Sequence, residues 1–212
     1  MGTSEEISRR FPKEIDLHEI LMPPGPQFLR ARPAAPQVHQ RVPVRLMEPA
    51  DKIAMLEFAR GLSQEDLLFL QTDITDPAGE EEWIANIRRG TTITLLAEPE
   101  NVLTGYASLQ VNPVRWTRQV GQIAINVIPE WRSRGLGERL CEEVVALARS
   151  LTLRKVVAQM VADHKSARAL FERLGFHVEA LLPDWVEDRE GHTRDLLLMA
   201  YALHSREHET KA

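Results

Sequence analysis

One stretch decides the fold: Gln122-Ile123-Ala124-Ile125-Asn126-Val127-Ile128-Pro129-Glu130-Trp131-Arg132-Ser133-Arg134-Gly135-Leu136-Gly137. Residues 122–128 alternate apolar with small or polar side chains, which is typical of a half-buried strand. Pro129 has no backbone N–H, so the strand is expected to end at Ile128. Past the glycines, the spacing of the apolar residues predicts one stripe on a long helix, formed by Leu140, Val144, Leu147 and Leu151.

The two glycines between this strand and this helix have a physical use. Without a Cβ atom, Gly135 and Gly137 let the backbone approach a ligand closely. The N–H groups of the first helical turn have no partner within the helix, and the helix dipole makes that end positive. With Arg132 and Arg134 beside them, these groups predict a site for an anion such as a pyrophosphate. Gly-x-Gly alone is equally consistent with an ordinary tight turn.

A longer pattern favours the anion site. Val127-x-Pro129-x-Trp131-Arg132-x-x-Gly135-x-Gly137 resembles the acetyl-CoA signature of the GNAT family of N-acetyltransferases. Residues 155–160 read as the next strand, and residues 167–176, ending in Gly-Phe, resemble the second signature of that family. The resemblance extends over roughly residues 42 to 203, and two motifs in the right order are more specific than either alone.

The resemblance implies an α/β fold, namely a mixed, mostly antiparallel seven-stranded sheet that is splayed at the central strand and flanked by helices. In the family a β-bulge produces the splay, and the pantetheine arm of acetyl-CoA pairs with the exposed backbone like an added strand. The Val127 N–H is expected to polarise the thioester carbonyl. The expected cofactor-binding residues are Ile125, Asn126, Val127, Arg132, Ser133, Arg134, Gly135, Leu136, Gly137, Glu138, His164 and Phe171.

The proton-transfer groups depart from the family pattern. A lysine-like amine has a pKa near 10.4 and must lose a proton before it attacks. Where the family often has a Glu and a Tyr, this chain has Gln159 and Phe171. Asp163 and His164 follow the same strand and are the expected catalytic substitutes; a solvated loop pair is the alternative. Weaker candidates for the base are Gln122, Glu65 and Asp73.

The function expected from the resemblance is therefore transfer of an acetyl group from acetyl-CoA to a primary amine. Seven acids and no base lie between Gly61 and Ile87, which is either a solvated face or a field that favours a cationic acceptor. Arg60-Gly61-Leu62-Ser63-x-Glu65-Asp66 also resembles a helix pair of bacterial protein-lysine acetyltransferases. A small molecule and a protein lysine both stay open as acceptors. A catalytically inactive acyl-CoA-binding sensor or scaffold is the alternative function.

Composition and short motifs argue against several other classes of protein. A net charge of −5 and a pI near 5.8 argue against a nucleic-acid binder. Cys141, the single cysteine, excludes an internal disulfide and is expected in the core. The sequence shows neither a membrane span nor a signal peptide, so a cytoplasmic location is expected. His204-Ser205-Arg206-Glu207-His208 matches a zinc-protease pattern, but a polar tail is the favoured interpretation of this stretch, and no metal is expected.

The predicted domains are a Pro-rich extension (1–41), a GNAT domain (42–205) and a polar tail (206–212). Residues 1–43 hold seven of the thirteen prolines, which predicts a solvated arm, with dimer contacts or a covering role left open. An edge strand is expected at 42–46 and helices at 50–60, from Ser63, and at 80–89. A hairpin is expected at 91–97 and 102–111, and closing strands at 178–182 and 195–202.

Overall fold

The computed structural model describes residues 42–67, 75, 77–187 and 191–203, apart from the side chains of residues 64, 65, 77 and 80. The predicted extension (1–41) and tail (206–212) lie outside these residues, as does the His-x-x-Glu-His pattern. Among the described helices, none has the length and apolar character needed to cross a membrane.

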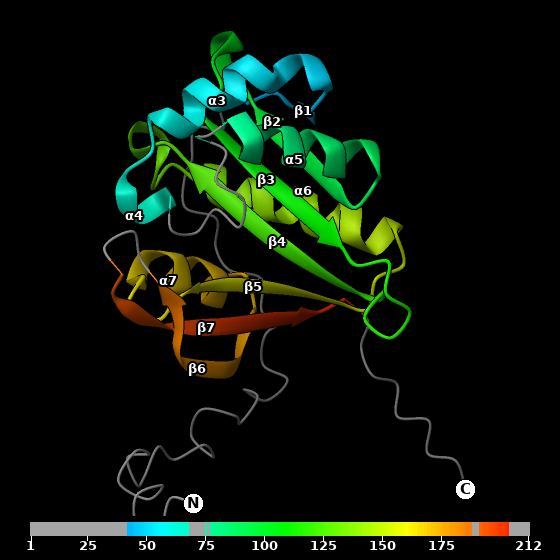
Figure 1. Ribbon diagram of the computed structural model, residues 1–212, viewed down its shortest axis with the longest axis vertical. Helices are drawn as coiled ribbons and strands as arrows, with labels where there is room; N and C mark the ends of the chain where they lie inside the picture. The colour runs from blue at the N-terminus through cyan, green and yellow to red at the C-terminus, as the bar shows by residue number, and fades with distance from the viewer. Residues whose placement is uncertain (1–41, 68–74, 76, 188–190, 204–212) are drawn as a thin grey trace, which may run out of the picture. The chain divides into compact units, whose positions relative to one another are not determined.

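Seven strands form one mixed sheet in the order β1-β2-β3-β4-β5-β7-β6 (Figure 1). Only β4 and β5 run parallel; every other neighbouring pair is antiparallel. This confirms the fold class expected from the sequence. The strands are β1 (Val44–Leu46), β2 (Thr92–Ala97), β3 (Gly105–Val111), β4 (Val120–Val127), β5 (Lys155–Val161), β6 (His177–Glu187) and β7 (Thr193–Ala202).

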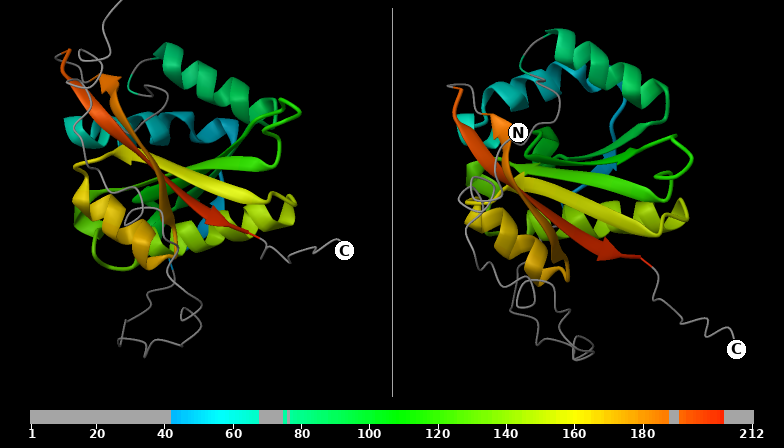
Figure 2. Two further views of the ribbon diagram at one scale, coloured as in Figure 1. Left: turned by 90° about the horizontal axis from the view of Figure 1, so that it is seen from below. Right: turned by 60° about the horizontal axis from the view of Figure 1, so that its bottom comes forward.

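Helices cover both faces of the sheet, as the two turned views show (Figure 2). One face carries α3 (Lys52–Arg60), α4 (Gln64–Leu67) and α5 (Pro77–Arg88), and the other carries α6 (Leu136–Ser150) and α7 (Lys165–Arg173). The expected helices are all present, with ends that differ by a few residues. Three single 3-10 turns begin at prolines: η2 (Pro49–Asp51), η3 (Pro99–Asn101) and η4 (Pro129–Trp131).

The apolar stripe of α6 packs on β3 and β4 to form the larger core. Leu140 and Val144 are completely buried there. The stripe ends earlier than expected: α6 stops at Ser150, and Leu151 is 41% exposed. Cys141 is buried, as predicted, and burial followed by the charges of Glu142 and Glu138 raises the pKa of its thiol to about 12. A thiol that stays protonated is a core side chain and not a nucleophile.

A second core lies on the opposite face of the sheet, beneath α3 and α5. Its centre is Tyr106, which is fully buried and packs edge-on against the rings of Phe58 and Trp83. Trp83 donates its indole N–H to the Thr94 hydroxyl, 3.1 Å away, so its polar atom is satisfied inside the core. This packing fixes α5 above β2 and β3.

The central strand β4 separates from β5 halfway along its length. The two strands pair only from Val120 opposite Lys155 to Ile123 opposite Ala158, although β4 continues to Val127 and β5 to Val161. The predicted splay is therefore present. The β-bulge is not, because β3 and β4 stay in unbroken register. Beyond Ile123, β4 stays paired with β3 and β5 stays paired with β7, so the two parts of the sheet separate between them.

The closing hairpin is longer than the sequence predicts. β6 continues beyond Leu182 through Pro183 to Glu187, with register shifts against β7 on both sides of the Ala180–Leu182 segment. A proline inside a strand is tolerated at a sheet edge and next to a bulge, and β6 is the edge strand here. The expected end at Leu182 was wrong because the sequence does not show which strand is at the edge.

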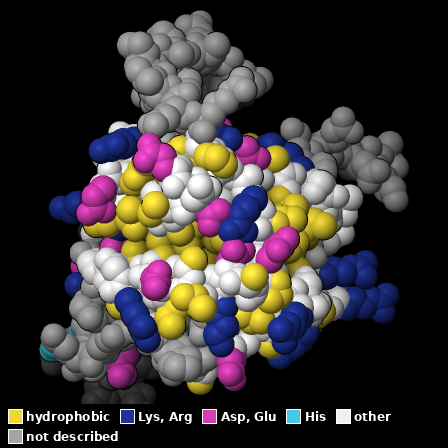
Figure 3. Space-filling model, turned by 90° about the horizontal axis from the view of Figure 1, so that it is seen from above, with side chains coloured by type: hydrophobic (Ala, Val, Ile, Leu, Met, Phe, Trp, Pro, Cys, Tyr) yellow, Lys and Arg dark blue, Asp and Glu magenta, His cyan; other side chains and the backbone are white. Residues whose placement is uncertain are grey.

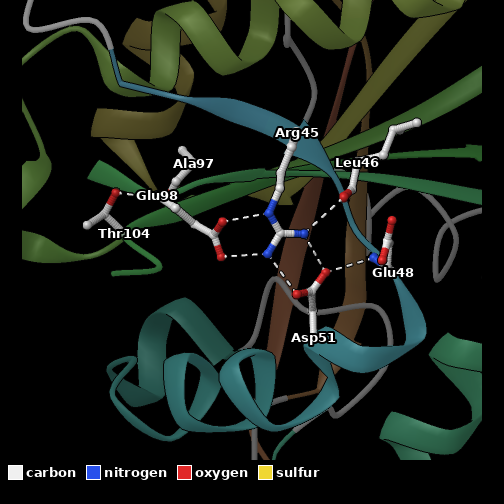
Figure 4. Close-up of polar contacts among 7 residues, drawn as sticks. All are labelled: Arg45, Leu46, Glu48, Asp51, Ala97, Glu98 and Thr104. Carbon is white, nitrogen blue, oxygen red and sulfur yellow. Dashed lines mark hydrogen bonds and ion pairs between the residues drawn. The ribbon is translucent and has the colours of Figure 1, made fainter. Parts of the chain in front are cut away.

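At the opposite edge, Arg45 holds the three-residue strand β1 in place (Figure 4). Its guanidinium donates to both carboxylate oxygens of Asp51, at 2.6 and 2.7 Å, and to both of Glu98, at 2.7 and 2.9 Å. The hydrogen bonds from Arg45 are the main reason that the pKa of Asp51 is lowered. Arg45 thereby ties β1 to the start of α3 and to the end of β2.

Replacing Arg45 with alanine is expected to lower the free energy of unfolding at pH 7 by about 1 kcal/mol, a modest value because the guanidinium is 43% exposed. Asp51 has a lowered pKa in the folded state, so its contribution is present above its unfolded pKa of about 3.9 and disappears as pH falls through the folded value. The difference between wild type and Arg45→Ala should therefore shrink below pH 4 in urea unfolding. A difference that is equal at pH 7 and pH 3 would contradict this account; Arg118→Ala is the control.

Candidate active site

The gap between β4 and β5 exposes backbone groups that no neighbouring strand uses. The Ile128 N–H donates to the Thr104 carbonyl across the β3–β4 register. The even-numbered residues of β4 therefore direct their backbone N–H and C=O groups towards β3. The odd-numbered residues Ile125 and Val127 therefore direct their N–H and C=O groups towards β5, beyond the last paired position at Ile123. Two N–H donors thus point into the open end of the sheet.

The loop at the open end of this gap leads directly into α6. Ser133 and Gly135 both have positive φ, +58° and +85°, and Gly135 occupies the N-cap position with no side chain capping the helix. The first-turn N–H groups of Leu136, Gly137 and Glu138 precede the first intrahelical bond, which runs from Arg139 to Gly135. A Cβ on Gly137 would meet Leu170 at 3.4 Å, an ordinary contact, so packing against protein does not require glycine there.

Arg132 does not extend towards the loop as the sequence suggested. Its Nε donates to the Val127 carbonyl at 2.9 Å, and its guanidinium bonds Asp66 of α4 at 2.6 Å. Burial opposes ionisation of Asp66, but the hydrogen bonds from Arg132 and Ser63 outweigh it, and its pKa is lowered. Arg132 therefore fixes the end of β4 against α4. Arg134 stays at the surface, with its guanidinium 5.4 Å from the centre of the Trp131 ring.

The two halves of this ion pair should differ in their effect on stability. Asp66 is only 5% exposed, whereas the Arg132 side chain reaches solvent. Arg132→Gln leaves a buried carboxylate without its main partner and is expected to cost about 2 to 4 kcal/mol of unfolding free energy. Asp66→Asn should cost roughly half as much, because the guanidinium can turn to water. Urea unfolding of both variants measures the asymmetry, and a larger loss for Asp66→Asn would contradict it.

A polar pocket of about 520 Å³ lies on the α5 face of the sheet, beside the paired half of β4 and β5. Its floor includes Gln122 and Val157, and Glu82 and Asn86 of α5 form part of its wall. The pocket does not include Ile125 or Val127. At about 3.3 Å per residue, Gln122 lies about 10 Å along β4 from the exposed N–H of Ile125. The pocket and the gap therefore occupy different parts of one strand.

Asn126 lies on β4 between the two donors of the gap. Its side chain is on the opposite face from Val127, where it is buried and donates to the Tyr106 hydroxyl at 2.9 Å. Burial raises the pKa of Tyr106, so this hydroxyl stays protonated. The sequence placed Asn126 among the cofactor residues through its backbone. The structure adds that its side chain fixes β4 against β3, a contact that the sequence did not predict.

The two expected catalytic residues, and the two residues at the positions of the family's usual base and acid, lie in different environments. Asp163 is at the surface, 3.1 Å from Arg194 on β7. His164 is half-buried at the start of α7, where β5 ends and the gap opens. The Gln159 side chain is exposed. Phe171 is only 6% exposed and packs edge-on against Phe176 at 5.0 Å, so little of its ring is open to a cofactor.

Of the seven acids between Gly61 and Ile87, the structure describes the side chains of Asp66, Glu81 and Glu82. Asp66 is paired with Arg132, Asp73 and Asp76 lie outside the described residues, and the side chains of Glu65 and Glu80 are not described. On the face seen in Figure 3, acidic and basic side chains are interspersed. Within the described ranges, no three His, Cys, Asp or Glu side chains are grouped so that they could hold a metal ion.

Sequence reasoning missed the residues that build the polar pocket. Thr92 and Gln110 lie on the predicted hairpin, and both line it. Polar residues at alternating positions of a strand usually indicate a solvent-facing side. The sequence does show a polar residue, Gln122, in the central strand that follows this hairpin. The register that places Gln122 beside Gln110 and Gln110 beside Thr92 is set only in the folded sheet.

Comparisons with known proteins agree with this geometry. The model of the acetyltransferase (GNAT) family matches residues 57–176. An L-methionine sulfoximine/L-methionine sulfone acetyltransferase of Pseudomonas paraeruginosa is 28% identical over 130 residues, 60% of this chain and 75% of that protein. The L-amino acid N-acyltransferase MnaT of Escherichia coli is 29% identical over 113 residues, 53% of this chain and 65% of that protein.

Solved structures share the fold. The yncA protein of Salmonella typhimurium, determined with its cofactor acetyl-CoA, superposes with a TM-score of 0.66 at 24% identity, covering 77% of this chain and 94% of that one. A phosphinothricin acetyltransferase of Sinorhizobium meliloti in complex with acetyl-CoA gives a TM-score of 0.63 at 21% identity, covering 76% of this chain and 88% of that one. The chain belongs to the GNAT family of acetyltransferases.

Proposed function

We propose that this protein is an acetyl-CoA-dependent N-acetyltransferase that acetylates the primary amine of a small molecule. The observation that carries the proposal is the gap between β4 and β5, with the N–H groups of Ile125 and Val127 directed into it. The gap opens beside the uncapped first turn of α6, so strand-like backbone donors and helix-terminal donors follow one another along a single path.

The residues present fit the two parts of acetyl-CoA. The peptide-like pantetheine arm would pair with the backbone of Ile125 and Val127, which stand on either side of Asn126 and direct their N–H groups into the gap. The pyrophosphate would accept hydrogen bonds from the N–H groups of the loop and first turn, residues 133–138, with Arg134 adding charge. The Val127 carbonyl already accepts a hydrogen bond from Arg132, so we assign only the N–H of Val127 to the cofactor. We assign Arg132 the role of holding β4 in place. His164 is assigned to the end of the gap where the cofactor binds, and Phe171 to the packing beneath that end.

The chemistry follows from these groups. An N–H of Ile125 or Val127 stabilises the negative charge that develops on the thioester oxygen while the neutral amine attacks the carbonyl carbon. The C–N bond forms, the C–S bond breaks, and the sulfur leaves as a thiolate. A thiol with a pKa near 8.5 needs no strong general acid, so an apolar side chain at Phe171 is compatible with turnover. The proton of the ammonium form passes to His164, and Asp163 is the second candidate.

The acceptor is a small molecule in this proposal, because the polar pocket has the volume of a small-ligand site, about 300 to 1,000 Å³. The related proteins named above are acetyltransferases or acyltransferases of amino acids and their analogues, which supports the same class. Initial rates of thiol release from acetyl-CoA, measured over a panel of amino acids, their amides, diamines and lysine peptides, test it. Turnover of peptides alone would contradict a small acceptor.

A second function is favoured by one observation. Gln159 and Phe171 occupy the positions of the usual base and acid, and Phe171 is buried among apolar rings. An acyl-CoA-binding sensor without catalysis would need neither proton-transfer group. Tight binding of acetyl-CoA without turnover of any amine in the panel would select this function over the first.

The domain boundaries form part of the proposal. We propose that residues 42–205 fold as the acetyltransferase domain without the Pro-rich extension. A variant lacking residues 1–38 is expected to melt cooperatively within about 4 °C of the full chain, the shift that a loss of 1 kcal/mol produces in a domain of this size. A fall of more than about 10 °C in the melting temperature would show that the extension contributes to the core or to a dimer interface.

A further inference from the structure

We infer that the polar pocket beside β4 holds the end of the acceptor that is remote from the reacting amine and selects amines that carry no carboxylate at that end. The inference rests on the proposed acetyl transfer and narrows its substrate class. It follows from three features of the pocket: its floor, the hydrogen-bonding capacity of its side chains, and its charge.

The floor is one row of register partners that crosses four strands. Thr92 of β2 lies opposite Gln110 of β3, Gln110 lies opposite Gln122 of β4, and Gln122 lies opposite Val157 of β5. Paired residues place their side chains on the same face of a sheet. All four line the pocket, so its floor is as rigid as the sheet itself.

The two glutamines supply unused hydrogen-bonding groups. Neither the Gln110 nor the Gln122 side chain forms a hydrogen bond with another side chain or backbone group among the described residues, in contrast to Asn86, whose side-chain oxygen accepts from Arg89. Each amide offers two N–H donors and one carbonyl acceptor. Seven of the twelve lining residues carry an amide or hydroxyl, so the pocket suits a body with several uncharged polar groups.

The charge of the lining excludes a carboxylate. Glu82 is the one charged residue among those that line the pocket, and no lysine, arginine or histidine of the described chain lines it. A carboxylate placed here would lose water without gaining a cationic partner and would face Glu82. A carboxamide, hydroxyl or second ammonium group would not incur these costs.

The distance between the pocket and the gap allows one acceptor molecule to reach both. About 10 Å of strand separates Gln122 from the Ile125 N–H, and Ala124 is the small residue between Gln122 and Asn126 on this face. An amine that reacts at the gap can therefore extend its body along β4 into the pocket. The pocket therefore meets the end of the acceptor that is remote from the amine, and it favours a neutral amide there over a carboxylate.

Two probes with the same reacting amine and the same chain test the inference: 8-aminooctanamide and 8-aminooctanoate, which differ only at the end remote from the amine. The measured quantity is the ratio of kcat/KM for the amide to that for the acid, in the full chain with saturating acetyl-CoA. We expect a ratio above about ten in the wild type, and a fall of about tenfold or more in Glu82→Lys, which puts a cation at the pocket wall. The intrinsic difference in reactivity between the two amines cancels when the ratio of one enzyme is compared with the ratio of another.

Glu81→Lys is the matched control, since Glu81 is adjacent on α5 but does not line the pocket. Its ratio of kcat/KM values should stay within about twofold of the wild-type ratio.

Calorimetric binding of both probes to the protein saturated with CoA gives a readout that needs no turnover. If neither probe is acetylated but the amide binds more tightly than the acid, and Glu82→Lys removes that preference, the pocket assignment holds and the proposed acetyl transfer fails. If the wild type prefers the acid in rate or in binding, or if Glu81→Lys shifts the preference as much as Glu82→Lys, the inference is overturned while acetyl transfer stands.

Discussion

Gly135→Asp is expected to reduce the affinity for acetyl-CoA by more than about a hundredfold while leaving the protein folded. Gly135 is the N-cap residue of α6 and no side chain caps this helix. A carboxylate at this position would stand beside the first-turn N–H groups that we assign to the pyrophosphate, and its negative charge would repel the phosphates.

Gly191→Asp is the matched control for backbone strain. Gly191 has φ +82°, close to the +85° of Gly135, and nothing lies within 4 Å of a Cβ there. Both variants place an aspartate in the left-handed region, at a similar cost. Calorimetric titration with acetyl-CoA should show wild-type affinity for Gly191→Asp. If folded Gly135→Asp binds as tightly as Gly191→Asp, the anion site is not at this loop.

His164→Ala is expected to lower kcat/KM for the amine by about 10²- to 10⁴-fold, the usual range for loss of a general base. In the wild type, log kcat/KM should rise with pH through one inflection, as the general base loses its proton. The inflection should be absent in the variant. His164 is favoured over Asp163 because it is half-buried where the gap opens, whereas Asp163 is exposed and paired with Arg194.

Asp163→Asn serves as the companion variant, and it should keep the wild-type inflection and most of the rate. Titration with acetyl-CoA separates catalysis from cofactor binding, because a His164 that only contacts the cofactor would weaken binding without changing the pH profile. If His164→Ala keeps both the rate and the profile, His164 has no part in proton transfer. If Asp163→Asn removes the inflection, Asp163 is the general base and His164 is not.

Local chemistry explains why the strand, the loop and the central helix could be predicted from the sequence. The alternation at residues 122–128, Pro129 and the glycines each act within a few residues of chain, and β4 and α6 lie close to the expected positions. The same reasoning identified Ser63 as a helix start, and its hydroxyl does accept from the Asp66 N–H at 3.1 Å. Signals of this kind need no knowledge of the rest of the sheet.

Features that depend on distant pairing were not predictable. Arg132 looked like a phosphate ligand because it stands beside the glycines, but its partner Asp66 is 66 residues away in the chain. The row Thr92–Gln110–Gln122–Val157 exists only through the register of four strands. The splay likewise depends on pairing between strands far apart in the chain, because β4 stays with β3 and β5 stays with β7, and it occurs without the bulge that the resemblance implied.

The most direct test of the account measures both products of the reaction in one experiment. Wild type, Gly135→Asp and Gly191→Asp are incubated with acetyl-CoA and the amine panel, and the free thiol and the N-acetylated amine are quantified together. The account predicts equal amounts of both products with wild type and Gly191→Asp, and neither above background with Gly135→Asp. Tight binding of acetyl-CoA to the wild type with no acetylated amine, or acetylation that persists in Gly135→Asp, would contradict it.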